Sequence, residues 1–237
     1  VYRQGKDSNI PINAQLINEG KTNLQWGDDF QMIECSGADA AAQIVKNIYL
    51  KEIQVYGMEQ VQILSPYKVR SAAGVLELNR SLQDDVNPPV SGKQELHLGG
   101  EIFREGDRIL QNKNTEVASN GDLGTLVQIS EDEDNNPIVQ IVFTDGRRVK
   151  YEAEQVEMME HANAITIHKS QGSECQVVII PWLKAFYPKL KRNMFYTGIP
   201  RAKLRGYIVG EWKAVCQAIH TDDTCTRKTM LASKIQQ

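Results

Sequence analysis

The chain has 237 residues, of which 41% are hydrophobic, and a formal net charge of −3. This length and composition can bury a core, so we expect one large domain or a medium domain with an insert. The sequence has no run of roughly 18 apolar residues, which a membrane span requires, and its first residues lack the pattern of a signal peptide. We expect a cytoplasmic protein without a membrane partner, and the absence of an initial Met indicates a part of a longer protein.

The distribution of charge and the spacing of the cysteines indicate which kinds of site the chain can form. Between Glu174 and Glu211 there is no Asp or Glu, and the basic residues in this window predict a positive face: Lys184, Lys189, Lys191, Arg192, Arg201, Lys203 and Arg205. The four cysteines show no C-x-x-C spacing, which indicates reduced thiols. Cys216, His220 and Cys225 lack a fourth ligand at a usual spacing, so we predict no metal site there.

The first part of the chain alternates between strand patterns and helix patterns. Strands are expected at Phe30–Cys35 and Val61–Pro66, and helices at Asp39–Tyr56 and over residues 73–86. Two prolines after Asn87 end the second helix. Strands separated by helices of this length predict a parallel sheet with crossover helices.

From Gly106 to Met158 the pattern changes to short strands of the β type, one of them expected at Pro137–Phe143. They are separated by the turn signals Asn120-Gly121, Asn135-Asn136-Pro137 and Asp145-Gly146. Such spacing predicts a small antiparallel barrel of about fifty residues, of the SH3-like or OB-like kind. We place this insert at residues 96–158 and an α/β domain at residues 1–95 and 159–237.

After the insert the α/β pattern resumes. Strands are expected at Ala164–Ile167, Gln176–Pro181 and Gly206–Gly210, and helices at Lys189–Ile199 and Trp212–His220. The all-apolar run 177–180 suits a parallel sheet that is covered on both faces. The predicted fold class is therefore α/β, a parallel sheet with flanking helices interrupted by a small β-barrel.

The polar turn from His168 to Glu174 is the first candidate site. Ligands of open parallel sheets bind beyond the carboxyl ends of the strands, where we expect this turn to lie. Glu174 is suited to accept a hydrogen bond from a sugar hydroxyl or to orient a cation. Donors of the kind that bind phosphate oxygens come from the turn and from the strand before it: Thr166, His168, Lys169, Ser170, Gln171 and the backbone at Gly172. These residues predict a phosphate or nucleic-acid contact, with a plain polar turn as the alternative.

Arginines and further lysines add to this prediction. Arg201 follows a helix packed by Met194 and Phe195, which is a rigid mount for a guanidinium that faces an anion, although a single Arg such as Arg201 or Arg3 is commonly only a surface charge. We predict weak, salt-sensitive binding of nucleic acid through phosphate contacts of the basic residues between Lys184 and Arg192 and of Lys68, Arg70 and Lys169. No stacking of bases is assigned to Tyr67 or Tyr187.

Three segments resemble a known family. Residues 164–174, "AITIHKSQGSE", resemble motif V of superfamily 1 helicases, residues 195–203, "FYTGIPRAK", resemble motif VI, and residues 1–4, "VYRQ", resemble motif IV. The resemblance is to the RecD-like branch that includes the alpha subunit of exodeoxyribonuclease V. Four further segments are similar in order and spacing: "VQILSPYK", "GVLELNRSLQDDVNP", "FREGDRILQNKN" and "NGDLGTL".

This resemblance implies a second RecA-like core domain with an SH3-like barrel inserted in it. It further implies the C-terminal half of an ATP-dependent DNA helicase of repair or recombination that moves 5′ to 3′. In such enzymes ATP lies between two RecA-like domains, and single-stranded DNA crosses both. The implied partners are single-stranded DNA, an N-terminal RecA-like domain, and other nuclease or helicase subunits.

The resemblance also assigns roles by matched position. Arg3 and Arg201 would face the γ-phosphate, with Arg201 as the arginine finger. Gln171, Gly172 and Glu174 would border the nucleotide. Contacts to the DNA backbone would come from Thr166, His168 and Ser170.

The chain departs from the family pattern in places. Gly198 and Pro200 stand where Ala and Thr are usual, which predicts a weaker helix before Arg201, and Cys175 replaces an aromatic residue. The sequence has no G-x-x-x-x-G-K-[ST] phosphate loop, so the Mg²⁺ ligands are expected in a separate N-terminal domain and this chain alone is expected to be inactive. The alternative is a binding module without ATPase activity that grips single-stranded nucleic acid or a protein.

Overall fold

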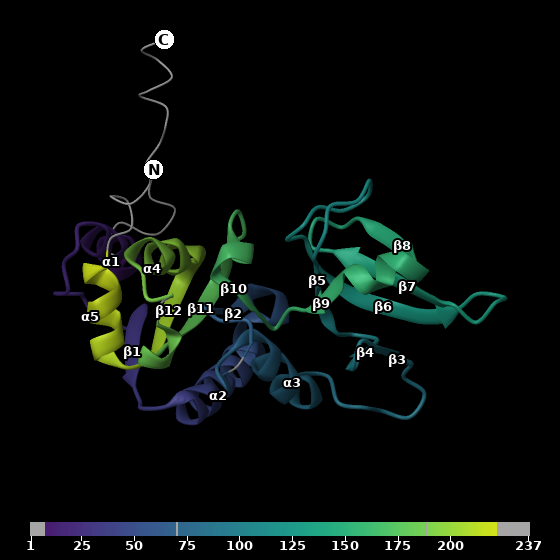
Figure 1. The fold of residues 1–237 in the computed structure, drawn as a ribbon, viewed down its shortest axis with the longest axis horizontal. Coiled ribbons are helices and arrows are strands. Elements are labelled where there is room, and N and C mark those ends of the chain that lie inside the picture. Colours follow the sequence, from purple (N-terminus) through teal and green to yellow (C-terminus); the bar gives the residue numbers. More distant parts are fainter. Residues whose placement is uncertain (1–7, 70, 188, 222–237) are drawn as a thin grey trace, which may run out of the picture.

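The central element is a parallel sheet of five strands (Figure 1). The computed structural model describes residues 8–69, 71–187 and 189–221. The strand order is β1-β12-β11-β2-β10, and each neighbouring pair is parallel. The strands are β1 (Phe30–Glu34), β2 (Val61–Ser65), β10 (Ala164–Thr166), β11 (Cys175–Trp182) and β12 (Ala202–Gly210).

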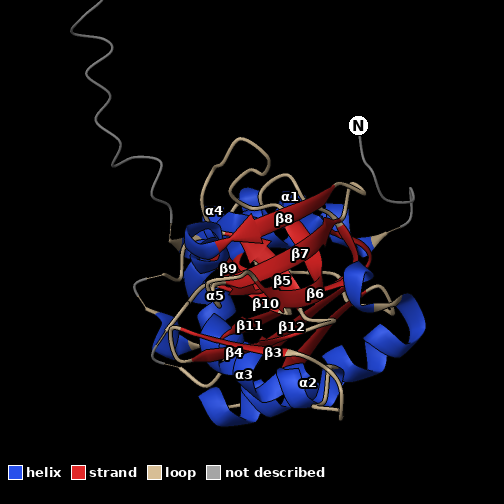
Figure 2. Cartoon of the chain, turned by 90° about the vertical axis from the view of Figure 1, so that its right-hand side faces the viewer, coloured by secondary structure: helices blue, strands red, loops and turns tan. Residues whose placement is uncertain are grey.

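Helices cover both faces of this sheet. One face carries α2 (Ala38–Tyr56) and α3 (Val75–Val86), and the other carries α1 (Asn9–Asn18), α4 (Arg192–Gly198) and α5 (Trp212–His220). In Figures 1 and 2, α2 and α3 lie below the strands and α1 and α4 lie above them. The predicted α/β fold with a parallel sheet and flanking helices is confirmed.

Alternation along the strands explains the two layers. The Tyr207 hydroxyl of β12 donates to Glu52 of α2 at 2.9 Å, whereas the indole of Trp182 in β11 donates to the Ala214 carbonyl of α5 at 3.2 Å. Neighbouring side chains on a strand point to opposite faces. In β11, Ile179 is level with Tyr207 and so faces α2, whereas Trp182 faces α5. Both faces of β11 are buried, as its apolar composition predicts.

A second sheet lies beside the central one and is antiparallel (Figure 1). We call it the inserted sheet, and its order is β8-β7-β6-β5-β9. Its strands are β5 (Arg108–Gln111), β6 (Leu123–Glu131), β7 (Pro137–Phe143), β8 (Arg148–Glu152) and β9 (Met159–His161). Within the described residues no ladder joins β8 to β9; the short helix η2 (Ala153–Met158) connects these two end strands.

The inserted sheet has its own core and a hairpin beside it. Buried side chains from all five of its strands and from η2 form the core, including Ile109, Leu126, Ile141, Tyr151 and Val156. The hairpin consists of β3 (Glu95–Leu98) and β4 (Glu101–Arg104). The predicted limits of the insert, 96–158, remain a prediction; β9, which pairs with β5, begins one residue after 158.

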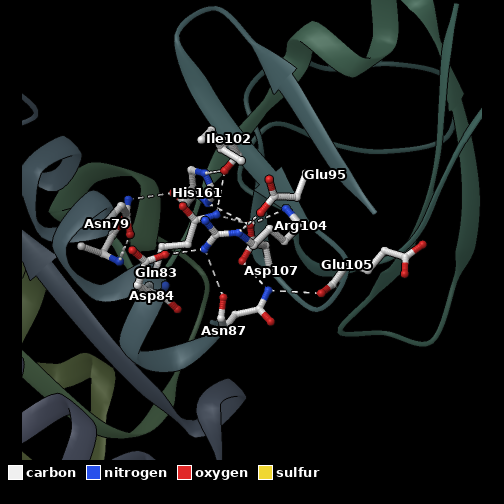
Figure 3. Close-up of polar contacts among 12 residues, drawn as sticks. Asn79, Gln83, Asp84, Asn87, Glu95, Ile102, Arg104, Glu105, Asp107 and His161 are labelled. Carbon is white, nitrogen blue, oxygen red and sulfur yellow. Dashed lines mark hydrogen bonds and ion pairs between the residues drawn. The ribbon is translucent and has the colours of Figure 1, made fainter. Parts of the chain in front are cut away.

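Asp107 is the centre of a buried polar contact between α3 and the inserted sheet (Figure 3). Its carboxylate is 3% exposed and accepts hydrogen bonds from Gln83 Nε2 and Asn87 Nδ2, each at 2.7 Å, and from the Arg104 amide at 2.8 Å. His161 Nδ1 lies 3.8 Å from the same carboxylate. We call these residues the buried junction.

His161 and Arg108 complete the contact from the inserted sheet. His161 Nε2 donates to the Ile102 carbonyl at 3.0 Å, and its ring stacks on Phe103 with centroids 4.3 Å apart. The Arg108 guanidinium donates to the carbonyls of Met58 and Val61 at 2.9 and 2.8 Å. These buried hydrogen bonds hold the two units in one arrangement.

No helix in the described part of the chain combines the length and apolar character needed to cross a membrane.

Candidate functional site

The segment that resembles motif V runs between the two ends of the central sheet. Thr166 is level with Ser65, the last residue of β2, whereas Val177 is level with Val61, the first. Residues 167–174 therefore leave the carboxyl edge of the sheet and return to its amino edge. The expectation that the whole turn lies at the carboxyl edge is wrong, because its second half leads into a parallel strand that starts at the opposite edge.

The first half of this segment is the short helix η3 (Ile167–Ser170). The Thr166 hydroxyl accepts from the Lys169 amide at 3.4 Å, and the Ser170 hydroxyl donates to the Ile167 carbonyl at 2.7 Å. Ser170 is 1% exposed, so a direct contact between Ser170 and DNA would require the turn to open. His168, in contrast, is exposed.

Gly172 marks the turn toward the amino edge. Its φ is +93°, and a Cβ placed there would meet no atom within 4 Å. The backbone conformation, and not crowding, therefore requires glycine. Gln171 and Gly172 are exposed, and the Ser173 hydroxyl donates to the Ser170 carbonyl at 2.8 Å.

Lys68 and Lys169 meet at the carboxyl edge around one carboxylate. Lys68 follows β2, and its Nζ lies 2.8 Å from Glu160 Oε1. Lys169 Nζ lies 3.2 Å from Glu160 Oε2 and 2.6 Å from Asn112 Oδ1. We call these four residues the exposed junction, because they also join the central sheet to the inserted sheet. Arg70, which is also predicted to contact a phosphate, lies outside the described residues.

The carboxyl edge continues from β2 to β11. The ring of Tyr67 stacks on Phe186 with centroids 5.3 Å apart, and its hydroxyl donates to the Tyr187 carbonyl at 3.4 Å. Lys184 and Lys189, which are exposed, belong to the same segment after β11. Lys68 therefore follows β2, and Lys184 and Lys189 follow its neighbour β11, at the carboxyl edge of the sheet. The distribution of charge in the sequence predicted a positive face but not its place at this edge.

Arg201 lies at the opposite, amino edge. It ends the short helix η5 (Ile199–Arg201), and its Nε donates to the Thr197 carbonyl at 3.1 Å and its Nη1 to the Ser173 carbonyl at 3.4 Å. Glu174 Oε2 pairs with Lys203 Nζ at 3.1 Å. Arg201 and Glu174 thus gather before β12 and β11. Arg3 lies outside the described residues.

The mount of Arg201 differs from a plain helix. A Cβ on Gly198 would lie 3.1 Å from Ile180 Cδ1 of β11 and 3.7 Å from Ile167 Cδ1 of η3, so glycine lets α4 pack closely on both. Pro200 stands in the first turn of η5, where the missing amide hydrogen is tolerated. α4 ends at Gly198 and the chain continues directly as η5, which keeps Arg201 beside Ser173.

Cys175, which directly follows Glu174, is a buried packing residue at the start of β11. It is 4% exposed and pairs with Ala202 at the start of β12. Burial raises the pKa of its thiol, against the opposing effect of Arg108 and Lys203. In the described residues no group of three or more His, Cys, Asp or Glu could hold a metal ion, and Cys225 lies outside them.

Sequence reasoning missed Glu160 and Asn112. Glu160 occurs in a mixed segment before the turn, and Asn112 is far away in the sequence, after β5. Neither stands in a local pattern that indicates phosphate chemistry, and only the pairing of β9 with β5 brings them to the same place.

Two known families match parts of the chain. The ATP-dependent RecD-like DNA helicase SH3 domain matches residues 78–143, and the UvrD-like helicase C-terminal domain matches residues 161–209. The first range runs from α3 to β7. The second contains η3, Arg201 and most of β12.

Individual proteins are also similar. The ATP-dependent RecD2 DNA helicase of Deinococcus radiodurans is 28% identical over 216 residues, which are 90% of this chain and 28% of that protein. An uncharacterised protein of Methanocaldococcus jannaschii, MJ1519, is 51% identical over 53 residues, which are 22% of this chain and 4% of that protein.

Solved structures show the same fold. Pif1 helicase from Bacteroides, in complex with ADP-AlF3 and ssDNA, covers 100% of this chain with a TM-score of 0.57 and 16% identity. Pif1 helicase from Candida albicans covers 100% of it with a TM-score of 0.54 and 15% identity. This chain spans 54% and 59% of those two chains. The resemblance to RecD-like DNA helicases that the motifs indicated is confirmed by the matches to both families and to RecD2 helicase.

Proposed function

We propose that this chain is the C-terminal part of an ATP-dependent DNA helicase of the RecD type, which moves 5′ to 3′ on single-stranded DNA. The observation that carries the proposal is the course of residues 167–174, which connect Lys169 at the carboxyl edge to the carbonyl that orients Arg201 at the amino edge. The named activity of the RecD2 relative and the nucleotide and ssDNA bound by Pif1 support it.

The amino edge is the proposed nucleotide side. Phosphoryl transfer spreads negative charge over the γ-phosphate oxygens, and a positioned guanidinium stabilises that charge. Arg201 suits this role because the carbonyls of Thr197 and Ser173 orient its planar group. Open space above Gly172 leaves room for a ligand next to Glu174, which fits the predicted nucleotide contact.

This chain supplies only part of such a site. When bound, ATP supplies the phosphoryl group whose transfer drives the motor. The sequence has no phosphate loop, so we place the phosphate loop and the Mg²⁺ ligands in a separate N-terminal RecA-like domain that closes over Arg201. Arg3 is proposed as a second γ-phosphate contact.

The carboxyl edge is the proposed DNA side. Thr166 ends β10, His168 and Lys169 follow it in η3, and Lys68 follows β2. Cationic and hydroxyl groups therefore lie at the carboxyl ends of two neighbouring strands. Such groups contact the phosphates of a strand without reading its sequence. Closure on ATP would move η3 through its packing on Gly198 and so change the grip on DNA.

Hydrolysis by variants of Arg201 tests the proposal. In a protein that joins this chain to its phosphate-loop domain, Arg201→Ala should lower DNA-stimulated ATP hydrolysis by about 10³ to 10⁵. Arg147→Ala, which removes a guanidinium from an exposed hairpin of the inserted sheet, is the matched control and should leave the rate unchanged. Robust hydrolysis by this chain alone, abolished by Arg201→Ala, would contradict the two-domain site.

A binding module without ATPase activity is the second candidate, and residues 198–200 favour it, because Gly198 and Pro200 depart from the helicase pattern just before Arg201. The residues encoded before Val1 discriminate between the two. A strand followed by a phosphate loop supports the helicase, and a start codon directly before Val1 supports the module.

A further inference from the structure

Glu160 lies between two lysines of the proposed DNA side. Its two carboxylate oxygens are divided between them, with Oε1 at 2.8 Å from Lys68 Nζ and Oε2 at 3.2 Å from Lys169 Nζ. The lysines belong to the loops after β2 and β10, whereas Glu160 belongs to β9 of the inserted sheet. The inserted sheet therefore provides the anion for a pair of cations on the central sheet.

This arrangement matches the way a phosphodiester is held. A backbone phosphate offers two non-bridging oxygens, and two ammonium groups can each bind one of them. Asn112 accepts a further hydrogen bond from Lys169 at 2.6 Å and so helps to fix that ammonium group. The Lys68 side chain is 44% exposed and the Glu160 side chain 20% exposed, so solvent and a ligand can reach the pair.

We propose that Glu160 occupies the place of a DNA phosphate and competes with it for Lys68 and Lys169. The inference rests on the proposed function, because it takes the carboxyl edge as the DNA side. The Lys68–Glu160 pair is exposed on its lysine side and the Lys169–Glu160 pair is partly buried, with both side chains reached by water. Ion pairs that water reaches are weak, so a polyanion that approaches the edge can displace the carboxylate. Glu160 thereby lowers the affinity for single-stranded DNA. At each binding event, Lys68 and Lys169 exchange the Glu160 carboxylate for a DNA phosphate.

The exchange also reaches the inserted sheet. Lys169 and Lys68 both bind Glu160, and Lys169 binds Asn112 in addition. When a phosphate takes both ammonium groups, the exposed junction loses these contacts. The inserted sheet then keeps its place through contacts that the exchange does not touch, among them the buried junction and the hydrogen bonds from Arg108 to the carbonyls of Met58 and Val61.

Binding of a fluorescein-labelled oligothymidine, followed by anisotropy, tests the proposal with the 237-residue chain. Glu160→Gln keeps the shape of the side chain and removes its charge, and it should bind about fivefold more tightly at about 50 mM salt. In the wild type, the carboxylate that the phosphate displaces takes up a cation from solution, which reduces the net release of ions, and the variant has no such carboxylate. The slope of log K against log salt should therefore steepen by about 0.7.

Glu157→Gln is the matched control. Glu157 lies in η2, three positions before Glu160, and it is exposed and makes no ion pair with either lysine in the described structure. This variant removes the same charge from the same segment, so its affinity and salt slope should remain close to those of the wild type. Glu160→Asp keeps the charge and should not gain affinity.

Three results would overturn the inference. They are equal or weaker binding by Glu160→Gln than by the wild type, an equal gain in Glu157→Gln, or an undiminished gain when Glu160→Gln is combined with Lys68→Met. If thermal unfolding shows that Glu160→Gln alone is unstable, the same comparison is made with Glu160→Ala. Absence of binding by wild type and variants alike would overturn the proposed DNA function as well, which separates that failure from this one.

Discussion

The inserted sheet contacts the central domain at two junctions that differ in burial. At the buried junction, Asp107 is 3% exposed and accepts three hydrogen bonds from neutral donors. At the exposed junction, the Lys68 and Glu160 side chains are 44% and 20% exposed and are joined by an ion pair. Buried, fully bonded groups are costly to separate, whereas exposed ion pairs are weak. We infer that the first junction sets the position of the inserted sheet and that the second is free to exchange partners.

Asp107→Ala is expected to have the largest effect on this comparison. It removes the acceptor of one N–H each on the Gln83 and Asn87 side-chain amides and of the Arg104 backbone amide in a buried site. The two side-chain amides keep only the carbonyls of Ile102 and Glu105. Each buried donor without a partner is costly, so the free energy of unfolding should fall by about 3 kcal/mol or more. Urea denaturation measures this free energy of unfolding. Asp134→Ala, in the exposed loop between β6 and β7, is the control and should change stability by less than about 0.5 kcal/mol.

His161 makes the buried junction sensitive to pH. Burial lowers the pKa of His161, although nearby Asp107 acts in the opposite direction. The unfolded chain binds a proton on this residue near its ordinary pKa of about 6.5, before the folded chain does. Stability is therefore present above that pH and is lost as the pH falls from about 6.5 toward the lower pKa of the folded state.

His161→Gln tests this dependence. The Gln amide can still donate to the Ile102 carbonyl but does not titrate in this range. Urea unfolding between about pH 5 and 8 should show a smaller loss of stability at acid pH than in the wild type. An unchanged pH dependence would show that other groups cause it.

Asn112→Ala should have the smallest effect. It removes one acceptor of Lys169, whose ammonium group retains Glu160 and water. The free energy of unfolding, measured by urea denaturation, should change by less than about 0.5 kcal/mol. A loss comparable to that of Asp107→Ala would refute the distinction between the two junctions.

Much of the fold could be predicted because its signals are local. The strand expected at Pro137–Phe143 and the helix expected at Trp212–His220 have the same bounds as β7 and α5. A short run rich in Ile and Val between turn signals indicates the first, and apolar residues at helical spacing indicate the second. Both patterns lie within one segment, so the order of residues suffices to find them.

Elements that depend on distant partners were missed. No helix was expected at Asn9–Asn18, where Ser8 caps the helix and Asp29 holds that cap by accepting from the Ser8 hydroxyl at 2.8 Å. β9 was likewise unexpected, because it is a strand only through its pairing with β5. In both cases the stabilising partner is far away in the sequence.

The sequence by itself determined the α/β class, the inserted antiparallel strands and the chemistry of the candidate residues, because periodicity, turn residues and side-chain types are local properties. Tertiary structure alone decided that residues 167–174 run from one edge of the sheet to the other, with Lys169 and Arg201 at opposite ends. It also placed Glu160 against Lys68 and Lys169. Pairing and register between distant strands decide such contacts, and no single segment contains them.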